Sequence, residues 1–333
     1  MNYLYVCMQG AKISYQNRRI IVQKDKEILK SIPIEPIECI EIYGNVQMTT
    51  QVVQECLKYH INVGLYTAGG FYLGNVFPVD SPIGVKLVKA QLFREMDHDF
   101  RIGIAKRIIK AKINNQKVVL KRYSPSSSSD LMEGIRNLSV LEQRVNRAAN
   151  IQEIMGIEGI AARSYFQCMG SFFENKFCFH KRTRKPACDP YNALINFGYA
   201  VLQNQIMGKL ILRGFLPSIG FIHSSKEYKQ ALAYDMMEEW RPVIVDALAA
   251  HCLHAHLLRE EHFVKDETGA VYLTAEGMKI YRRKIEDKYE AEMTYLKTNA
   301  SISFRRSLKY QVDSMAKAIL YNDYNLYVPC RIR

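Results

Sequence analysis

The chain has 333 residues, of which 48% are hydrophobic; this excludes an intrinsically disordered protein and favours two packed domains over one. Lysine and arginine total 46 against 33 acidic residues, and the resulting net charge of +13 suits a polyanionic partner, either nucleic acid or an anionic membrane surface. We find no secretory signal and no apolar stretch long enough to span a bilayer, and the eight cysteines include no CxxC pair. These features predict a soluble, cytoplasmic protein with reduced thiols and no membrane association.

The first part of the chain carries strand patterns. Three short β-branched or alternating runs predict strands, at residues 12–15, 19–22 and 37–43. Residues 50–60 interrupt them with a helical pattern. Two further runs, residues 63–66 and 71–73, flank Gly69-Gly70 as the arms of a β-hairpin would. We therefore expect a β-rich, sandwich-like domain over residues 1–84.

Helical patterns follow. Apolar residues recur at helical spacing over residues 85–123, with many lysines and arginines between them. Residues 124–129, rich in serine, predict a loop. Helical spacing then dominates residues 131–320, apart from a hairpin pattern around residues 268–269. The predicted fold class is α+β, with the N-terminal β-rich domain followed by a larger all-α C-terminal catalytic domain over residues 85–333.

Glu158 is the first candidate for chemistry. It lies close to two glycines, Gly156 and Gly159, which leave space for a ligand to approach the backbone. A carboxylate in the first turn of a helix, where the helix dipole favours it, explains the same segment better on its own.

His223 and the acids that follow it are the second candidate. His223 ends an apolar, glycine-punctuated loop, and the next helix carries Asp235 and Glu238, three residues apart and so on one face. An imidazole with two carboxylates suits Mg²⁺ or Mn²⁺. From spacing alone, a solvated acidic helix face beside a loop histidine is an equally good explanation.

Two further clusters complete the candidates. Four cations within five positions, Lys181, Arg182, Arg184 and Lys185, form either a solvated face or a grip on phosphates. A second cluster contains potential zinc ligands: His251, Cys252, His254, His256 and His262. His256 points away from the other two histidines of its helix, so a plain, partly buried helix is favoured over a zinc site.

Taken together and in this order, the motifs resemble those of the CRISPR-associated spacer-acquisition integrase family, Cas1, over nearly the whole chain. The resemblance rests on six segments: residues 44–47 with 67–70, 90–91 with 112–116, 158–166, Asp189-Pro190-Tyr191-Asn192-Ala193-Leu194, 217–223 and 232–242. One departure falls at Tyr228-Lys229-Gln230-Ala231, where the family commonly has Gly-Arg-Pro-Ser.

This resemblance implies that Glu158, His223 and Glu238 are the metal ligands, with Asp235 beside them to hold a second ion or orient a water. It implies a metal-dependent DNA endonuclease and integrase, using Mg²⁺ or Mn²⁺, that inserts spacer DNA into a CRISPR array by attack of a 3′-hydroxyl on a phosphodiester. A hydrolytic metal-dependent DNA or RNA nuclease and a non-catalytic basic DNA-binding scaffold stay open as alternatives. A tyrosine-recombinase mechanism is set aside, because no arginine-rich set surrounds a tyrosine.

The resemblance also implies partners. These are DNA, as spacer fragments and the CRISPR repeat, a second copy of the chain in a homodimer, and the small protein Cas2 in a heterohexamer. We expect the dimer surface on the β-domain, because a small sheet needs cover for its edges. Lys181, Arg182, Arg184 and Lys185 are expected to contact DNA phosphates.

Overall fold

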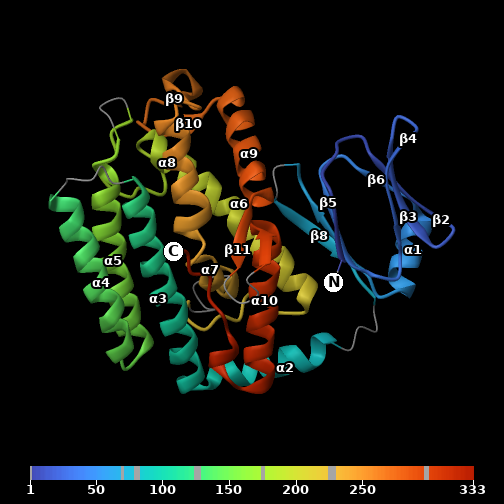
Figure 1. The fold of residues 1–333 in the computed structure, drawn as a ribbon, viewed down its shortest axis with the longest axis horizontal. Helices are drawn as coiled ribbons and strands as arrows, with labels where there is room; N and C mark the ends of the chain where they lie inside the picture. Colours follow the sequence, from blue (N-terminus) through green and yellow to red (C-terminus); the bar gives the residue numbers. More distant parts are fainter. Residues whose placement is uncertain are drawn as a thin grey trace. The chain divides into compact units, whose positions relative to one another are not determined.

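The computed structural model describes residues 2–68, 71–78, 83–123, 129–173, 177–223, 230–295 and 300–333 (Figure 1). The chain divides into two compact units. The first comprises Met1–Lys89 with Asn204–Leu216, and the second comprises Ala90–Gln203 with Pro217–Arg333. Strands dominate the first unit and helices the second, which confirms the predicted α+β fold class.

Two four-stranded sheets form most of the first unit. One sheet contains β1 (Asn2–Val6), β5 (Ile37–Tyr43), β7 (Asn62–Tyr66) and β8 (Tyr72–Val76), in that spatial order. Its first three strands are parallel, and β8 pairs antiparallel with β7, which confirms the predicted hairpin; Gly69-Gly70 lies outside the described residues. The other sheet has the order β4 (Glu27–Pro33), β3 (Arg19–Lys24), β2 (Lys12–Gln16) and β6 (Gln47–Met48).

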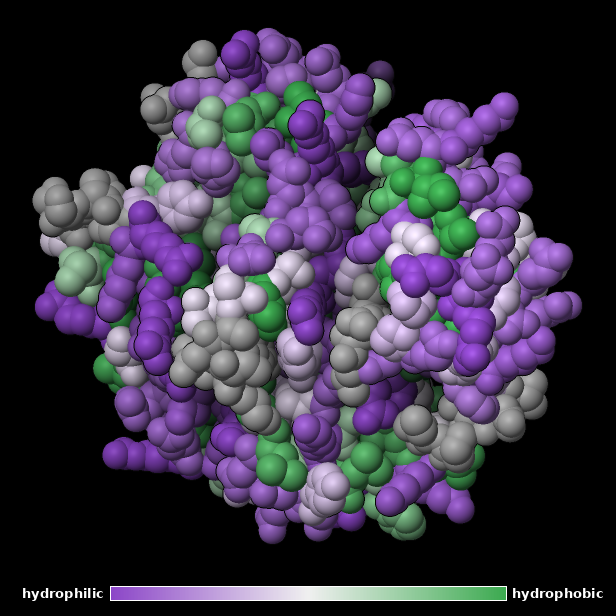
Figure 2. All heavy atoms as spheres, turned by 45° about the vertical axis from the view of Figure 1, so that its right-hand side comes forward, coloured by the Kyte–Doolittle hydropathy of each residue, from purple (hydrophilic) through white to green (hydrophobic). Residues whose placement is uncertain are grey.

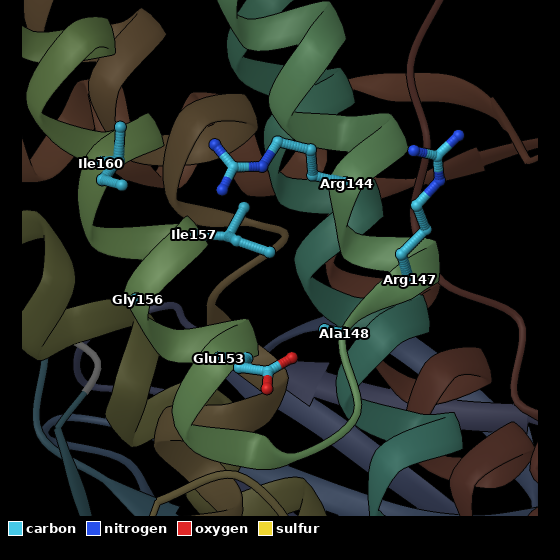
Figure 3. A pocket seen from close by; sticks show the side chains of 7 residues that line it. All are labelled: Arg144, Arg147, Ala148, Glu153, Gly156, Ile157 and Ile160. Atoms are coloured by element: carbon cyan, nitrogen blue, oxygen red, sulfur yellow. The ribbon is translucent and has the colours of Figure 1, made fainter.

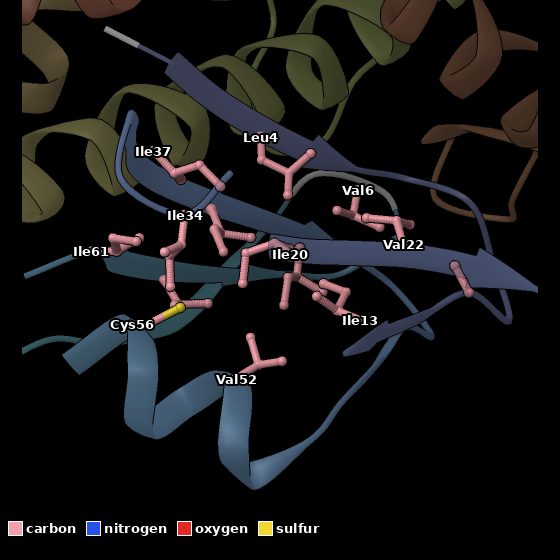
Figure 4. Packing of buried hydrophobic residues seen from close by; sticks show 14 residues of the cluster. Leu4, Val6, Ile13, Ile20, Val22, Ile34, Ile37, Val52, Cys56 and Ile61 are labelled. Atoms are coloured by element: carbon pink, nitrogen blue, oxygen red, sulfur yellow. The ribbon is translucent and has the colours of Figure 1, made fainter. Parts of the chain in front are cut away.

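The hydrophobic core of the first unit draws on both sheets and on α1 (Thr50–Lys58) (Figure 4). Leu4 and Ile37 come from one sheet, Ile13 and Ile20 from the other, and Val52 from the helix. Alternate residues of a strand point to opposite faces, so the alternating runs of the sequence place one set of side chains inward.

The second half of α6 (Pro190–Arg213) covers part of the opposite face of β5 and belongs to the first unit. Lys209 Nζ lies 2.8 Å from Glu41 Oε1, and the Tyr43 hydroxyl donates to Glu41 Oε2 at 2.6 Å. Both charged side chains are buried. Since β5 is covered on both faces, its glutamate needs this cation as a partner.

Helices make up most of the second unit. They are α2 (Ile83–Met96, divided between the units), α3 (His98–Tyr123), α4 (Ser129–Arg147), α5 (Ile151–Gly170), the first half of α6, α7 (Ala231–Met237), α8 (Ala247–His254), α9 (Ala275–Glu290) and α10 (Phe304–Tyr321), with short 3-10 turns η3 (Glu260–His262) and η4 (Tyr324–Leu326). The helices α3, α4 and α5 pack against one another (Figure 1).

Several local predictions can be compared with this arrangement. The helical pattern of residues 85–123 forms two helices rather than one, because Asp97 Oδ1 accepts the Phe100 N–H at 3.0 Å and starts α3. Ser129, predicted in a loop, is the first residue of α4; residues 124–128 lie outside the described residues. The hairpin around residues 268–269 is confirmed as β9 (Phe263–Lys265) and β10 (Val271–Leu273), and a second hairpin, β11 (Glu292–Tyr295) with β12 (Ala300–Ser303), was not expected.

A π-helical turn, η2 (Arg241–Asp246), joins α7 to α8. The Arg241 guanidinium lies 4.6 Å from the ring centre of Tyr199, and the Tyr199 hydroxyl donates to Asp246 Oδ1 at 2.5 Å. Burial raises the pKa of Asp246 to about 6, although the bond from Tyr199 opposes that rise.

The described part of the chain contains no helix that is both long and apolar enough to cross a membrane. All eight cysteines are free thiols, as predicted. The face shown in Figure 2 is mostly hydrophilic, with small hydrophobic groups scattered over it.

Replacing Ile13 with alanine should lower the free energy of unfolding by about 2–5 kcal/mol, because this fully buried side chain would leave a cavity between the sheets. Ile28→Ala is the matched control, since Ile28 is 59% exposed on β4 and its truncation should change stability by less than about 0.5 kcal/mol. Urea unfolding measures both values. Equal effects would contradict the assignment of the core.

The free energy of unfolding of Asp246→Asn, taken relative to that of the wild type, should increase as the pH rises from 4 to 7. In the folded wild type the pKa of Asp246 is about 6, above the ordinary 3.8, so stability is lost as the carboxyl ionises over this range. The expected gain is about 3 kcal/mol at pH 7 relative to pH 4. Thermal unfolding across this pH series tests it, with the exposed Asp287→Asn as control; a gain independent of pH would refute the assignment.

Candidate functional site

Glu158 lies in the interior of α5, not in its first turn. The helix begins at Ile151 after the N-cap Asn150, whose side chain accepts the Glu153 N–H, so Glu153 is the acid that the helix dipole stabilises. The explanation that the sequence favoured for Glu158 is therefore wrong. Its carboxylate must have another reason to be there.

Lys112 on α3 provides that reason. Its Nζ forms a short ion pair with Glu158 Oε1 and another, at 2.5 Å, with Glu238 Oε2. Glu238 belongs to the turn between α7 and η2, and the structure thus brings two of the predicted site acids to one cation. Lys112 and Glu238 are buried, and Glu158 is largely so, with its side chain 17% exposed.

A second cation, Arg241, completes this charge cluster. Arg241 Nη2 lies 3.1 Å from Glu238 Oε1, so each oxygen of Glu238 faces a different cation. Burial alone would raise the pKa of Glu238, but Arg241 and Lys112 outweigh it and hold that pKa well below its usual range. For Lys112 the penalty of burial is likewise outweighed by Glu158 and Glu238, which raise its pKa. Glu238, Lys112 and Arg241 are therefore charged at neutral pH.

His223 is fixed from behind by Asp235. Asp235 Oδ1 lies 2.7 Å from His223 Nδ1 and accepts the His223 backbone N–H at 2.9 Å, while Oδ2 accepts the N–H groups of Phe221 and Ile222 at 2.6 and 3.0 Å. Burial disfavours the charged imidazole, but Asp235 and then Glu238 outweigh this and raise the pKa of His223. The close approach of the loop also requires Gly220, because a Cβ there would meet Asp235 Oδ2 at 2.8 Å.

The donor set fits a divalent ion: two carboxylates, plus an imidazole whose Nδ1 is held by a carboxylate, as is usual for a metal-binding histidine. The side chains do not, however, stand in a finished coordination shell. Among the described residues no three His, Cys, Asp or Glu groups are gathered closely enough to hold a metal ion as they stand. Glu158 and Glu238 instead form ion pairs with Lys112.

Sequence reasoning missed Lys112 and Arg241. Lys112 was readable in principle, since it falls four residues after Ile108 and seven before Val119, on the apolar stripe of α3. A lysine on a buried stripe needs an acidic partner. Arg241 gave no such signal, because its place depends on the π-helical turn.

The four predicted DNA contacts divide into two groups. Lys181, Arg184 and Lys185 are exposed. Arg182 is partly buried: one guanidinium nitrogen donates to Asn192 Oδ1 at 2.8 Å, the other to Asn196 Oδ1 at 2.5 Å, and the group lies 5.4 Å from the ring centre of Tyr199. Burial lowers its pKa. Arg182 therefore ties the cation-rich loop to α6.

The histidine-rich segment has structural roles. His254 stacks on Tyr123 and Phe173, with ring centres 5.8 and 5.7 Å apart, and His262 Nδ1 accepts the Arg259 N–H at 2.9 Å. The helix α8 is partly buried, as the sequence favoured, with Cys252 buried and His251 and His254 exposed, while His256 and His262 lie beyond its end. Of the segment that departs from the family pattern, Tyr228 and Lys229 lie outside the described residues, which resume at Gln230.

A separate hollow lies between α4 and α5, lined by Arg144, Arg147, Glu153, Gly156 and Ile160 among others (Figure 3). Glu158 follows Gly156 by two residues, which is about 200° around the helix. The hollow therefore opens on the other side of α5 from the charge cluster and is not part of it.

Comparison with known proteins identifies the family. The model of the family described as CRISPR associated protein Cas1 matches residues 4–287. A CRISPR-associated endonuclease Cas1 of Mycobacterium tuberculosis is 30% identical over 321 residues, covering 96% of this chain and 94% of the relative, and one of Clostridium perfringens is 27% identical, covering 95% of each.

Solved structures show the same fold. A chain of a partial Cas6-RT-Cas1–Cas2 complex superposes with a TM-score of 0.87 and 25% identity, covering 100% of this chain and 99% of that one. A Cas1 protein from Thermotoga maritima gives a TM-score of 0.74 at 23% identity, with 96% of each chain covered. With the family model matching most of its length, this chain belongs to the Cas1 family of CRISPR-associated proteins.

Proposed function

We propose that this protein is a divalent-metal-dependent DNA endonuclease and integrase that joins the 3′-hydroxyl of a short DNA to a phosphodiester of a CRISPR array. The observation that carries the proposal is the convergence of Glu158, Glu238 and Lys112, with His223 fixed nearby by Asp235. Relatives that match nearly the whole chain are named endonucleases.

Glu158 and Glu238 would hold Mg²⁺ or Mn²⁺ through oxygen, and His223 through Nε2. The bound ion would neutralise negative charge that develops on the phosphate and would orient the attacking oxygen. Asp235 keeps the His223 ring in one orientation, and its four hydrogen bonds give it a supporting role rather than that of a ligand. Lys112 and Arg241 together balance the charge of the two glutamates in the present arrangement, and a bound ion would take over the contacts that Lys112 makes with them.

Arg241 and Lys112 place two positive charges beside the two glutamates of the site. Both are paired with the buried Glu238, so salt screens them much less than it screens surface cations. A phosphate entering the site would meet cations that are already in position, which avoids reorganisation at the moment of reaction.

We further propose that the protein acts as a homodimer, through its β-rich unit, and joins the small protein Cas2 in a heterohexamer. The similarity to a Cas6-RT-Cas1–Cas2 complex supports this partner. The expected DNA substrates are spacer fragments and the CRISPR repeat.

Glu158→Gln should abolish joining of a fluorescent 3′-end to a plasmid, by on the order of 100-fold or more, and should abolish Mn²⁺ binding measured by calorimetry, because an amide cannot replace the anionic ligand. Glu133→Gln, an exposed change on the neighbouring helix α4, is the matched control and should retain both. Undiminished joining by Glu158→Gln would sink the metal-site proposal. Nicking without joining in the wild type would instead favour the hydrolytic nuclease.

Replacing Lys181, Arg184 and Lys185 together with alanine should weaken DNA binding for all sequences and reduce its dependence on salt, with the logarithmic slope falling by roughly 2–3. A variant lacking Lys12, Lys26 and Lys30, three exposed lysines of the β-rich unit, has the same change of net charge and controls for it. Fluorescence anisotropy across a salt series measures both. Equal losses would show that only net charge matters.

A further inference from the structure

The segment Tyr327–Ile332, called here the strap, lies beside α3 and next to the residues that surround Glu238. Its approach begins at η4, where the Tyr324 ring packs so closely on α3 that a Cβ at Gly103 would clash with it. Arg107 then donates to the Tyr324 and Asn325 carbonyl oxygens at 3.0 and 2.8 Å. These contacts hold the chain on α3 ahead of the strap.

Glu239, the residue after the proposed ligand Glu238, is the main anchor of the strap. It is fully buried, and its Oε1 accepts short hydrogen bonds from the Tyr327 hydroxyl and from Gln311 Nε2. Its Oε2 accepts the Cys330 backbone N–H at 2.6 Å. Two of the three donors to this carboxylate therefore come from the strap.

Asn115 supplies the second anchor. This buried side chain donates to the Glu239 carbonyl oxygen at 2.8 Å and to the Cys330 carbonyl oxygen at 2.9 Å, while its Oδ1 accepts the Ile332 N–H at 3.0 Å. Asn115 follows Lys112 by three residues on α3, so the helix that carries the cation of the site also carries the strap.

The local backbone explains why these anchors matter. Glu238, Glu239 and Trp240 form the turn between α7, which ends at Met237, and η2, which starts at Arg241. Backbone bonds from the Glu238 N–H to the Asp235 carbonyl oxygen and from the Trp240 N–H to the Met237 carbonyl oxygen connect this turn to α7. Trp240 Nε1 donates to Gln311 Oε1, and Gln311 also meets the Tyr327 hydroxyl at 2.7 Å. Side-chain bonds to α3, α10 and the strap thus add to the backbone bonds that hold this turn.

We propose that the strap is a positioning element for the metal site, which acts through Glu239 and Asn115 to hold the Glu238 carboxylate toward Glu158 and His223. This inference rests on the proposed metal-binding function of Glu238. Glu239, Asn115 and Tyr327 are positioning residues, since the hydrogen bonds among them and to Cys330 join the strap to the turn that carries Glu238.

The test uses two mild variants of the full chain. Tyr327→Phe removes the hydroxyl that donates to Glu239. Glu239→Gln keeps the shape of the side chain but places an amide N–H where a carboxylate oxygen accepts from Tyr327 and Gln311 or from the Cys330 N–H. Both should weaken Mn²⁺ binding by about 10- to 100-fold, as loss of a supporting hydrogen bond behind a metal ligand does. Tyr321→Phe is the matched control, because Tyr321 is 74% exposed on α10, and it should bind Mn²⁺ like wild type.

Mn²⁺ affinity is measured by calorimetry at a temperature where thermal unfolding shows every variant folded, and joining is measured as a function of Mn²⁺ concentration. A positioning role predicts that high Mn²⁺ restores joining by Tyr327→Phe to near the wild-type rate. Wild-type Mn²⁺ affinity in both variants, with binding lost in Glu238→Gln, would overturn the inference and leave the proposed function standing. Wild-type affinity in Glu238→Gln would overturn both.

Discussion

The burial of acidic side chains is the constraint on which the second unit depends. An ionised carboxylate taken out of water is stable only where cations or several donors surround it. Glu238 is surrounded by two cations, and Asp235 by three backbone N–H groups and an imidazole. Glu239 has a tyrosine, a glutamine and a backbone N–H as donors, and burial nevertheless raises its pKa well above the usual range. Because these partners come from distant segments, satisfying the acids is also what draws the segments of the site together.

The sequence predicted the fold where local pattern decides it. Alternating runs gave the strands of the first unit, and spacing gave the helices of the second, because both patterns reflect one face turned inward. It did not predict the pairing of Glu41 with Lys209, since a glutamate in an alternating strand looks solvent-facing until a helix more than 160 residues later covers it. For the same reason, the membership of Asn204–Leu216 in the first unit could not be read from the chain.

For the site, the family resemblance selected the candidate residues, and the structure shows which of them contact one another. From spacing alone, ordinary structural roles explained Glu158, His223 and Glu238 at least as well as metal binding did. For Glu158 that role was a place in the first turn of a helix, and the start of α5 at Ile151 excludes it. The role of Asp235 follows only from its hydrogen bonds with His223. A helix pattern shows which face of the helix an acid occupies, but not which loop packs against that face. The same limit hid Lys112, whose two partners lie 46 and 126 positions away.

The π-helical turn has a consequence for how this family member can change. Its hydrogen bonds span five residues rather than four, so Arg241 and Asp246 both reach Tyr199, whereas in an α-helix residues five apart point about 140° away from each other. Deleting one residue here would restore an α-helix and rotate everything after it. Sequence drift can therefore replace side chains in this stretch but cannot readily alter its length, and an insertion or deletion here would disturb the partner of Glu238 more than most substitutions would.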